Sequence, residues 1–388
     1  MVILGAGPAG LVLGNLLLAG GVGCVVLERA TRAQLGARQR AGFLAANTVR
    51  TLERHGLAEG LLRDGRTHTT CEFRTEDGRF RLDYSSLGRG EPHTVYPQHL
   101  LVGDLLTQYL NAGGQILFGA EAMAVQGAAG TRPVVTVRDG DGRPGRWHGR
   151  YVAGCDGRHG AARRSLPPGA VRRHRLDHGV SWLGLLAEAP PSLDAVGYAV
   201  HERGFAGHMA RTPEVTRYYL QCERGSSAED WPDDRIWDEL ALRMRADRYG
   251  PLRRGPVLDR AVVHLESDVL EPLRHGALFL AGDAASLISP SAAKGANLAV
   301  LEAELLALAL IDDLRHGTPE GLEQYSARCL EHIWRAQEFS RWMVRLLHSD
   351  PGTDGSPPFH DRLRRSRLAS LRTSRSCQDW FADHYVGV

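Results

Sequence analysis

Apolar residues recur with two different periods along the 388-residue chain, and its N-terminal segment carries the clearest pattern. Val2–Leu4 is an apolar run of strand length, and residues 11–19 have the apolar spacing of a helix. A second apolar run, residues 24–27, ends in Glu28. The order of strand, helix and strand predicts a βαβ unit. Because the first strand begins almost at Met1, a few residues are expected to be missing upstream.

Apolar patterns typical of strands and of helices also follow one another along the rest of the chain. Strand-like and helical segments alternate in a way that predicts a nucleotide-binding α/β part interrupted by a second, antiparallel sheet. The chain then returns to the first part and continues through helices to about residue 349. The expected helices are 48–64, 100–111, 231–249 and 295–314, and the expected strands are 71–84 with a turn at Asp77-Gly78, 134–137, 151–155, 179–188, 198–222 and 278–281.

The turn between the first strand and the first helix reads Gly-Ala-Gly-Pro-Ala-Gly, a G-x-G-x-x-G pattern. Gly5 suits the tight turn, Gly7 lets the backbone approach a pyrophosphate, and Gly10 allows close packing of the helix on the strand. Phosphates then meet free N–H groups at a helix N-terminus. Glu28 stands at the spacing where an acidic side chain accepts a hydrogen bond from a ribose hydroxyl. The unit therefore predicts a dinucleotide site.

Composition places the chain among ordinary globular proteins, with 43% hydrophobic residues, 24% charged residues and a formal net charge of +2. Its length suits two interleaved domains. The charge balance offers no global attraction for nucleic acid or a membrane. The six cysteines are far apart and form no C-x-x-C pair. We therefore expect no disulfide and no metal site, and a reducing cytoplasm as the location.

The C-terminal tail combines arginines with interleaved leucines. This pattern fits a solvated helix, packed on the body of the protein or on a second subunit, better than it fits an RNA-binding arm. The arginines are Arg362, Arg364, Arg365, Arg367, Arg372 and Arg375, and the leucines are Leu363, Leu368 and Leu371.

A second motif that indicates a cofactor site lies at Ala281-Gly282-Asp283. Asp283 directly follows a predicted buried strand, and cofactors bind at the carboxyl ends of the strands in open α/β sheets. Together with the N-terminal glycines and Cys155-Asp156-Gly157, it resembles the three signatures of the single-component (class A) flavoprotein aromatic hydroxylases. Within that family the likeness is to the 4-hydroxybenzoate 3-monooxygenase group and runs nearly end to end. The matching runs are 38–42 (RQRAG), 63–68 (RDGRTH), 94–98 (TVYPQ), 152–160 (VAGCDGRHG), 182–187 (WLGLLA), 203–205 (RGF), 217–221 (RYYLQ), 278–285 (LFLAGDAA), 293–298 (AKGANL) and 385–387 (YVG).

The resemblance implies a fold and a reaction. The fold is a Rossmann-like α/β FAD-binding domain interleaved with an antiparallel-sheet substrate domain of the α+β kind, followed by a C-terminal helical region. In the reaction, NADPH or NADH reduces FAD, O2 is captured as a flavin C4a-hydroperoxide, and an aromatic acid of the 4-hydroxybenzoate type is hydroxylated. The protein must hold an electron-rich ring, ionise its phenol and exclude water. The implied domains are 1–70, 98–175 and 270–300 for FAD, 71–97 and 176–269 for the substrate sheet, and 301–388 for the helices.

The resemblance also implies roles for individual residues. Tyr198 receives the phenolic proton of the substrate, Tyr385 bonds to Tyr198, and His68 connects this relay to solvent. Taken singly, each tyrosine would be read as a core residue and His68 as a surface residue. Arg211 pairs with the substrate carboxylate and Tyr219 supports it. Trp182 lines the substrate site, and the loop at the reaction site contributes Pro290, Lys294 and Asn297. The residues along the path of the nicotinamide coenzyme are Arg38, His159 and Arg163. The FAD contacts besides Gly5, Gly7 and Gly10 are Glu28, Arg29, Arg40, Gln98, Asp156, Arg217, Gly282 and Asp283.

Three positions depart from the family pattern around the substrate. Met209 stands where the family has a serine that also bonds the carboxylate, Gly207 replaces a leucine, and Phe43 replaces a valine on the flavin side. A thioether is at most a weak acceptor, so one hydrogen bond worth about 1 kcal/mol is lost. Gly207 is expected to make room for an added ring substituent, and Met209 is expected to pack against one. These changes favour a substituted 4-hydroxybenzoate, for instance one with a 3-amino group. The alternative is that they compensate one another and that plain 4-hydroxybenzoate is hydroxylated at carbon 3.

Two further departures concern the coenzyme. Glu266 replaces a family arginine near the coenzyme path, and Gln34 replaces a tyrosine in the segment that selects the coenzyme. The arginines at positions 29, 38, 40 and 163 suit a phosphorylated coenzyme. A carboxylate beside phosphates weakens binding, so we expect NADPH to be favoured only modestly over NADH.

Two other functions stay open at this point. A flavin-dependent halogenase shares the FAD domain, but Trp182 is followed by Leu-Gly-Leu, and the chain has no W-x-W-x-I-P run. A non-hydroxylating flavoprotein, either an electron carrier or a redox sensor, keeps the FAD motifs without the relay. The presence of Tyr198, Tyr385, His68 and Arg211 argues against it. A homodimer is expected from the resemblance alone, without a nucleic-acid or membrane partner.

Overall fold

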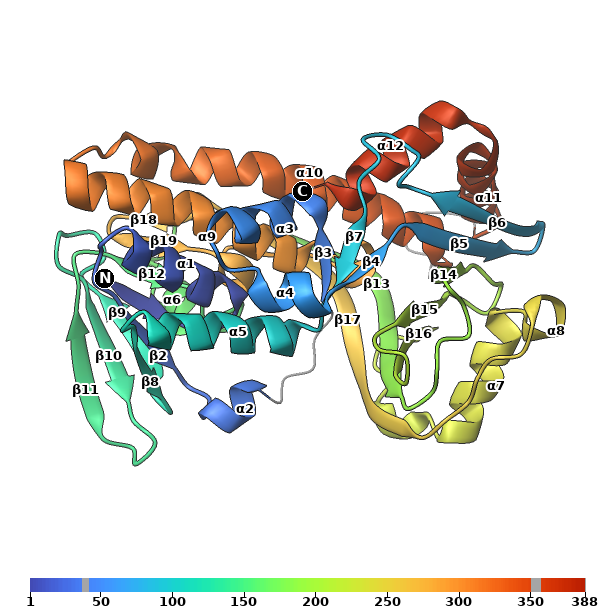
Figure 1. Cartoon of the computed structure of the whole chain (residues 1–388), viewed down its shortest axis with the longest axis horizontal. Coiled ribbons are helices and arrows are strands. Elements are labelled where there is room, and N and C mark those ends of the chain that lie inside the picture. The colour runs from blue at the N-terminus through green and yellow to red at the C-terminus, as the bar shows by residue number, and fades with distance from the viewer. Residues whose placement is uncertain (37–41, 350–356, 388) are drawn as a thin grey trace.

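The computed structural model of the chain describes residues 1–36, 42–349 and 357–387. Within them, a six-stranded sheet carries the N-terminal residues (Figure 1). Its neighbouring strands pair in parallel, apart from the antiparallel pair at one edge. The strands are, in spatial order, β18 (Arg274–His275), β19 (Leu278–Leu280), β12 (Val152–Gly154), β1 (Val2–Leu4), β2 (Val25–Glu28) and β8 (Gln115–Phe118).

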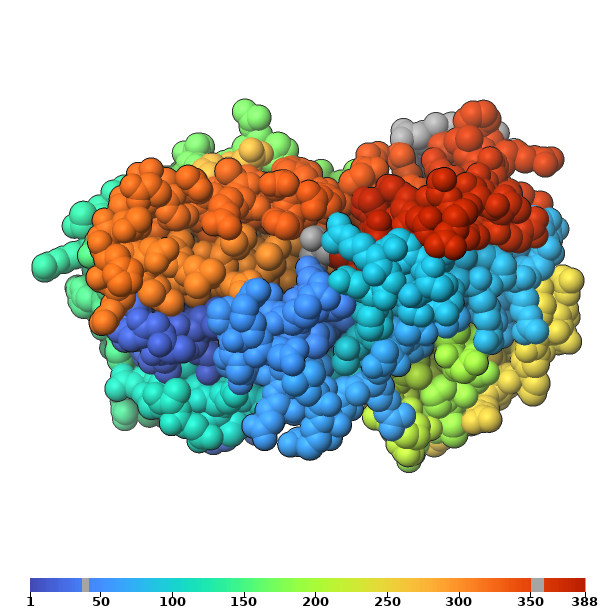
Figure 2. Space-filling model, turned by 45° about the horizontal axis from the view of Figure 1, so that its top comes forward, coloured from blue at the N-terminus to red at the C-terminus, as the bar shows by residue number. Residues whose placement is uncertain are grey.

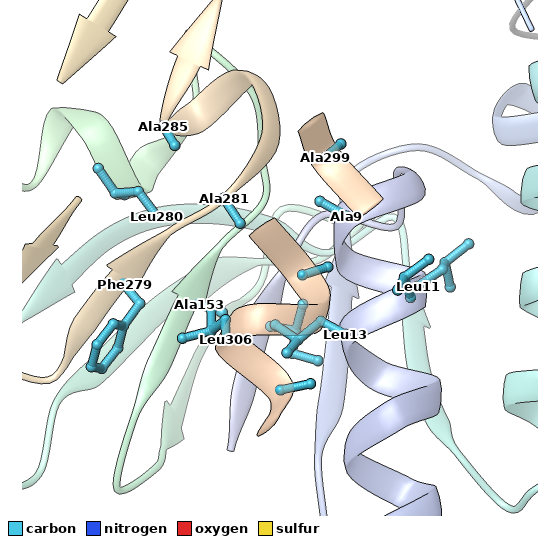
Figure 3. Close-up of a cluster of buried hydrophobic side chains, with 14 of the residues drawn as sticks. Ala9, Leu11, Leu13, Ala153, Phe279, Leu280, Ala281, Ala285, Ala299 and Leu306 are labelled. Atoms are coloured by element: carbon cyan, nitrogen blue, oxygen red, sulfur yellow. The ribbon is translucent and has the colours of Figure 1, made fainter. Parts of the chain in front are cut away.

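The predicted βαβ unit lies at the centre of this sheet and is confirmed. Its helix α1 (Pro8–Ala19) begins three residues earlier than its apolar spacing indicates, because Pro8 fits the first turn of a helix. Helix α9 (Gly295–Ile311) packs beside α1, and both are buried over most of their surface, as their nearly unbroken apolar sequences predict. Figure 3 shows Leu13 of α1 and Leu306 of α9 beside Ala153 and Phe279 of the sheet, in one apolar core.

A second, eight-stranded sheet forms the other half of the molecule (Figure 1). It is antiparallel except where β5 and β14 pair in parallel. Two long strands, β13 and β17, run side by side for almost their whole length. The sequence did not predict β17, because charged residues interrupt its alternation. The strands are, in spatial order, β20 (Ser286–Leu287), β17 (Val257–Glu271), β13 (Arg172–Ala187), β16 (Thr216–Cys222), β15 (Ala206–Ala210), β14 (Val196–Ala199), β5 (Thr70–Thr75) and β6 (Gly78–Asp83).

Two small sheets complete the strands of the described residues. In one, β7 (His93–Val95) lies between β3 (Phe43–Ala45) and β4 (Arg66–His68), and its register sets His93 opposite His68. The other has β10 (Val134–Arg138) between β9 (Glu121–Gln126) and β11 (Pro144–His148). The parallel sheet, the antiparallel sheet and the C-terminal helices together confirm the predicted fold class.

Two expected helices are divided. The expected helix 48–64 is α3 (Ala46–Arg54) and α4 (Glu59–Asp64), separated at Gly56, whose φ of 69° ends the first helix. The expected helix 231–249 is α7 (Asp233–Arg243) and α8 (Ala246–Tyr249), separated at the left-handed Arg245. The other helical elements are α2 (Arg32–Gly36), α5 (Gln98–Asn111), α6 (Ala161–Arg164), the 3-10 turns η1 (Ala228–Asp230), η2 (Gly282–Ala284) and η3 (Pro290–Ala292), and the π-helix η4 (Asp312–His316).

The C-terminal helices join the two halves. Helix α10 (Glu320–Leu347) runs along both, and α11 (Pro357–Thr373) and α12 (Arg375–Val386) lie against the β5–β6 hairpin. Figure 2 shows these last helices, in red, covering the light-blue strands. Leu368 and Leu371 are buried, so the arginine-rich tail packs on the body of the protein, as one of the two predicted arrangements requires.

Candidate active site

The three glycines of the first turn have the surroundings that a phosphate site requires. Gly5 has a φ of +94°, and a Cβ there would lie 2.5 Å from the carbonyl oxygen of Cys155. A Cβ on Gly10 would clash with the carbonyl oxygen of Gly5. Gly7, in contrast, has no atom within 4 Å of the position of a Cβ, and no side chain caps the N-terminus of α1 behind it. Open space in front of uncapped N–H groups fits a pyrophosphate.

Glu28 lies at the end of β2 against this turn. Its carboxylate accepts hydrogen bonds from the backbone N–H groups of Ala6 and Ala30, both at 2.8 Å. These bonds fix a buried acid beside the glycine turn, at the edge where a dinucleotide's ribose would lie. The contact with the ribose stays a prediction.

Further acids gather at the carboxyl ends of β12 and β19. The Oδ1 atom of Asp156 is buried without a hydrogen-bond partner among the described residues, and burial raises the pKa of this carboxyl group. Gly282 has a φ of +64°, and its N–H donates to Glu302, whose pKa burial raises to about 8. Sequence analysis overlooked Glu302, which lies inside an apolar helix. The Oδ1 atom of Asp156, without a partner among the described residues, and the glycine turn beside Asp283 fit a second region of contact with the same dinucleotide.

The remaining predicted cofactor contacts are more scattered. Gln98 is the first residue of α5, Arg29 is exposed after β2, and Arg217 lies in β16 with a buried Nε that has no partner among the described residues. Arg38 and Arg40 lie outside the described residues.

The two relay tyrosines meet. The hydroxyl of Tyr198, on β14, lies 2.7 Å from the hydroxyl of Tyr385, on α12, and both side chains are buried. Burial raises the pKa of both hydroxyl groups, so both are protonated near neutral pH. A buried pair of phenols can pass a proton along its hydrogen bond without carrying a lasting charge.

His68 contacts Tyr84, a tyrosine that was not among the predicted relay residues. Its Nδ1 lies 3.1 Å from the hydroxyl of Tyr84, and that hydroxyl also donates to the carbonyl oxygen of His68 at 2.9 Å. His93 lies between these groups, stacked on Phe43 with ring centroids 4.0 Å apart and edge-on to Tyr385 at 4.9 Å. Sequence analysis overlooked Tyr84 and His93. The only available signal was the position of His93 directly before the matching run 94–98.

The loop before α9 ties the site together. Asn297 donates to the carbonyl oxygen of Phe43 at 3.1 Å and accepts from the N–H of Ala45 at 2.8 Å. The ammonium group of Lys294 donates to the carbonyl oxygen of Tyr385 at 2.8 Å, and burial lowers the pKa of Lys294 to about 7. Pro290 is exposed at the start of η3. Two of the three predicted loop residues thus position β3 and the relay tyrosine.

Four of the other predicted substrate residues share the face of the antiparallel sheet that carries Tyr198, namely Tyr219, Gly207, Met209 and Trp182. Across adjacent strands, Tyr198 is paired with Gly207, and Gly207 with Tyr219. Met209 follows Gly207 by two residues, so both point to this face. The ring of Trp182 contacts that of Tyr219 in a tilted arrangement, with centroids 4.8 Å apart. These four residues and Tyr198 therefore lie on one side of this sheet, and Tyr385 of α12 and Phe43 of β3 pack in the same cluster.

Arg211 supplies a buried positive charge at the end of β15. Its side chain is only 8% exposed, it makes a hydrogen bond to Tyr219, and burial lowers its pKa. Its Nη1 has no partner among the described residues, and neither does the neighbouring Nε of Arg217. Unpartnered guanidinium donors at a buried site are costly unless an anion completes them, and a carboxylate matches their geometry.

The space beside Gly207 is smaller than the sequence suggested. A Cβ on Gly207 would lie 2.8 Å from the ring of Phe205 and 3.2 Å from that of Tyr219. Phe205 therefore fills the volume that we expected Gly207 to open for a ring substituent. Phe205 also stacks on Trp182 at 5.2 Å, and the indole N–H of Trp182 donates to His348 at 2.5 Å. His348 is a buried wall residue that sequence analysis overlooked.

The predicted coenzyme residues have partners within the chain. Arg163 is half-buried and donates to Asp268 at 2.8 Å and to the carbonyl oxygen of Ala284 at 2.7 Å. Glu266 is buried and lies between Arg175, at 2.8 Å, and Arg158. Two guanidinium groups therefore balance the negative charge that we expected to act unopposed on coenzyme phosphates.

The remaining two residues of this region lie at the surface. His159 accepts from Arg158 at 2.8 Å. Gln34 accepts from the N–H of Thr31 at 2.9 Å, on the exposed helix α2. Neither contact removes the residue from the protein surface, and both residues are exposed.

Three properties of the described residues bear on the other predictions. All six cysteines are free thiols. Residues 1–36, 42–349 and 357–387 contain no group of three or more histidine, cysteine or acidic side chains that could hold a metal ion. None of the helices in these ranges is long and apolar enough to cross a membrane.

Comparisons with known proteins agree with this geometry. The family described as FAD binding domain matches residues 1–340. The chain is 35% identical to p-hydroxybenzoate hydroxylase of Acinetobacter baylyi over 386 residues, which cover 100% of this chain and 94% of that protein. It is 29% identical to a 3-amino-4-hydroxybenzoate 2-monooxygenase of Streptomyces platensis over 391 residues, which cover 93% of each chain.

Solved structures show the same fold. p-Nitrophenol 4-monooxygenase from Pseudomonas putida has a TM-score of 0.82 at 17% identity, covering 100% of this chain and 98% of that one. Anhydrotetracycline hydroxylase from Streptomyces rimosus has a TM-score of 0.78 at 23% identity, covering 99% of this chain and 75% of that one.

Proposed function

The chain belongs to the FAD-dependent aromatic monooxygenases of the hydroxybenzoate hydroxylase type, and from this premise we propose that it hydroxylates a substituted 4-hydroxybenzoate. Enzymes of this class use FAD, NAD(P)H and O2. One observation carries the proposal: a buried guanidinium, Arg211, whose Nη1 has no partner among the described residues, directly follows β15, and the neighbouring strand β14 carries Tyr198, which is hydrogen-bonded to the buried Tyr385 of α12. Together they match the two ends of a 4-hydroxybenzoate.

The spacing of these two groups suits such a substrate. Arg211 lies four residues along the chain from Gly207, the residue opposite Tyr198, which corresponds to roughly 13 Å of strand. The long arginine side chain and a benzoate ring together can bridge that span. The carboxylate completes the unpartnered donors near Arg211, and the phenolic hydroxyl comes to Tyr198.

The chain's own residues then prepare the ring. Tyr198 accepts the phenolic proton while it passes its own proton to Tyr385, and the ring becomes an electron-rich phenolate. The aromatic wall of Trp182, Phe205 and Tyr219 holds the ring and excludes water. When bound, FAD reduced by the coenzyme supplies the activated oxygen that this ring attacks. The residues that would hold FAD are the glycine turn, Glu28, Asp156 and Asp283.

We place the ring substituent near Met209 rather than beside Gly207, because Phe205 occupies the latter space. A thioether packs well against an added group and adapts to its shape. Support for a 3-amino substituent comes from the name of the Streptomyces platensis relative, and support for the plain acid comes from the name of the Acinetobacter baylyi relative. A 4-hydroxybenzoate with a 3-amino group is therefore the proposed substrate, and plain 4-hydroxybenzoate is the second candidate.

Product analysis by mass spectrometry tests the proposal. Purified enzyme with FAD, NADPH and O2 is expected to add one oxygen atom to the 3-amino acid with higher kcat/KM than to the plain acid. The reverse order would establish the plain acid as the substrate. Coenzyme oxidation that any aromatic acid stimulates but that yields only H2O2 would instead identify a non-hydroxylating flavoprotein.

Met209→Ser is expected to change this preference. The serine hydroxyl restores a hydrogen bond worth about 1 kcal/mol to a substrate carboxylate and removes the apolar contact with a substituent. We expect kcat/KM to rise about fivefold for plain 4-hydroxybenzoate and to fall by a similar factor for the 3-amino acid. Steady-state kinetics with both acids measure it. Met123→Ser, on β9, is the control and should leave both values unchanged; equal effects on the two acids would exclude Met209 as a determinant.

We also propose that NADPH is the preferred coenzyme. The predicted coenzyme region holds three positive charges, on Arg158, Arg163 and Arg175, and two negative charges, on Glu266 and Asp268. These guanidinium groups suit a 2′-phosphate. The preference is modest because the two buried acids engage the same arginines.

Glu266→Gln is expected to lower the KM for NADPH about fivefold without changing kcat. The variant removes one negative charge and releases two guanidinium groups, and one unit charge at contact distance in water is worth about 1 kcal/mol. Coenzyme oxidation at varied NADPH and NADH concentrations measures the effect, which should be smaller for NADH. Glu271→Gln, on the same strand but paired with His174, is the matched control. An unchanged KM for NADPH would place the coenzyme elsewhere.

The assembly, location and domain limits stay predictions. We propose a cytoplasmic homodimer with the three domain groups given by the resemblance. Size-exclusion chromatography with light scattering tests the dimer.

A further inference from the structure

The proposed relay has a gap between its two hydrogen-bonded pairs. Tyr198 and Tyr385 form one pair at 2.7 Å, and His68 and Tyr84 form the other at 3.1 Å. No hydrogen bond among the described residues joins Tyr385 directly to His68. The buried proton donor therefore needs a further group before the proton reaches the half-buried histidine.

Tyr84 lies where such a group is needed. Its ring meets that of Tyr385 edge-on, with centroids 5.3 Å apart, and its hydroxyl contacts both the Nδ1 and the carbonyl oxygen of His68. Its side chain is fully buried, so its hydroxyl group serves internal partners. Burial raises the pKa of Tyr84, and negative charge on Tyr198 would raise it further, because the two hydroxyl groups lie within electrostatic reach of each other.

His93 holds this junction. Its ring lies edge-on to both Tyr84, at 5.5 Å, and Tyr385, at 4.9 Å, and it comes from the strand position opposite His68. Its Nδ1 is buried and has no hydrogen-bond partner among the described residues. Burial, and then the charge of Lys294, lower the pKa of His93 well below its ordinary value, so the imidazole is neutral. A neutral ring can keep the two phenols together without trapping the proton.

We propose that Tyr84 is an additional relay residue that carries the substrate's phenolic proton from the Tyr198–Tyr385 pair to His68. The inference rests on the proposed function. In the transfer, the substrate O–H bond breaks and Tyr198 gains that proton while it gives its own to Tyr385. No hydrogen bond among the described residues joins Tyr385 to Tyr84, so a water molecule between their hydroxyl groups takes the proton of Tyr385 and gives one of its own protons to the Tyr84 oxygen. The Tyr84 hydroxyl proton turns from the carbonyl oxygen of His68 to its Nδ1. His68 releases its Nε2 proton to solvent, so a phenolate and one released proton are the net products.

Tyr84→Phe tests the inference in the holoenzyme, because it keeps the ring against Tyr385 and His93 and removes only the hydroxyl. Stopped-flow mixing with plain 4-hydroxybenzoate and a pH-indicator dye measures proton release on binding. We expect the rate of release to fall at least about tenfold, with substrate Kd changed less than about twofold. Tyr109→Phe, a buried tyrosine in α5 that bonds backbone carbonyl groups, is the matched control and should not change the rate.

A double-mutant cycle makes the result specific. If Tyr84 and His68 serve one path, Tyr84→Phe combined with His68→Asn slows proton release no more than the stronger single variant. Multiplied losses, or an unchanged rate in Tyr84→Phe with normal FAD content, overturn the inference. These outcomes are separate from failure of the proposed function, because in that case the wild-type enzyme itself forms no hydroxylated product.

His93→Leu is the second variant, for the case that Tyr84→Phe does not fold. It loosens the contact between Tyr84 and Tyr385, so it is expected to slow proton release with unchanged substrate Kd. An unchanged rate of proton release in His93→Leu overturns the inference.

Discussion

Replacing Arg211 by methionine is expected to lower kcat/KM for a 4-hydroxybenzoate about 100- to 1000-fold, mainly through KM. Arg211 is buried, and its Nη1 has no partner among the described residues, so the carboxylate of the substrate is the partner that we propose for it. Removing one member of a buried, hydrogen-bonded charge pair costs about 2 to 5 kcal/mol, since the remaining charge is left without compensation. Methionine keeps the length and apolar stem of the side chain, which limits the loss to the guanidinium group.

A ligand without the charge is the matched control for this variant. For 4-hydroxybenzamide, which keeps the ring and hydroxyl but has no carboxylate, wild type and Arg211→Met should bind with similar Kd. Arg211→Lys should recover only part of the affinity, because an ammonium group cannot make two parallel hydrogen bonds. Equal losses for acid and amide would show that Arg211 supports the fold rather than the carboxylate. Flavin-fluorescence titration measures the Kd of each ligand, and steady-state kinetics measure kcat/KM.

The parts of the structure that sequence predicted are those that local chemistry determines. Gly5 and Gly10 are required because a Cβ at either position would collide with the backbone, and that requirement is visible in the spacing of the glycines alone. The apolar runs of α1 and α9 likewise indicate burial on all sides. The two divided helices were not visible, since Gly56 and Arg245 interrupt otherwise regular helical patterns.

The parts that sequence could not predict depend on strand register. His93 reaches the relay because β7 pairs with β4, and no local pattern indicates that pairing. The β5–β6 hairpin and its turn were expected, but the alternation of its residues does not show that Tyr84, directly after β6, contacts His68. The same holds for Glu266, whose two arginine partners come from β13 and from the turn after β12. The charge of Glu266 looked unopposed in the sequence, whereas the β13–β17 ladder brings Arg175 to it.

The relay roles themselves came from family resemblance, and the geometry now explains what each side chain can do. Tyr198 and Tyr385 are far apart in the chain, and only the docking of α12 against the eight-stranded sheet joins their hydroxyl groups. Lys294 reinforces this docking through the carbonyl oxygen of Tyr385. The C-terminal helix therefore contributes a residue to the proposed active site.

Replacing Tyr198 by phenylalanine is expected to reduce the rate of ring hydroxylation at least about 100-fold while coenzyme oxidation continues. The variant removes the group that accepts the phenolic proton, and a positioned acid or base contributes about 100- to 10,000-fold to a proton-transfer step. The substrate then stays a neutral phenol, which is too poor in electrons to be hydroxylated, and the activated oxygen is lost as H2O2. The ratio of hydroxylated product to coenzyme consumed, by chromatography and oxygen electrode, measures this uncoupling.

Two comparisons separate proton transfer from structural damage in Tyr198→Phe. Tyr218→Phe is the matched control, because Tyr218 is equally buried in the same sheet but bonds Ser192 on the opposite face, and it should hydroxylate normally. Ring-fluorinated 4-hydroxybenzoates, whose phenols ionise at lower pH, should enter the site already as phenolates. The deficit of Tyr198→Phe is therefore expected to shrink as the substrate's phenol becomes more acidic. A deficit that stays constant across that series would mean that Tyr198 positions the ring without accepting its proton, and the relay would then have to begin at another group.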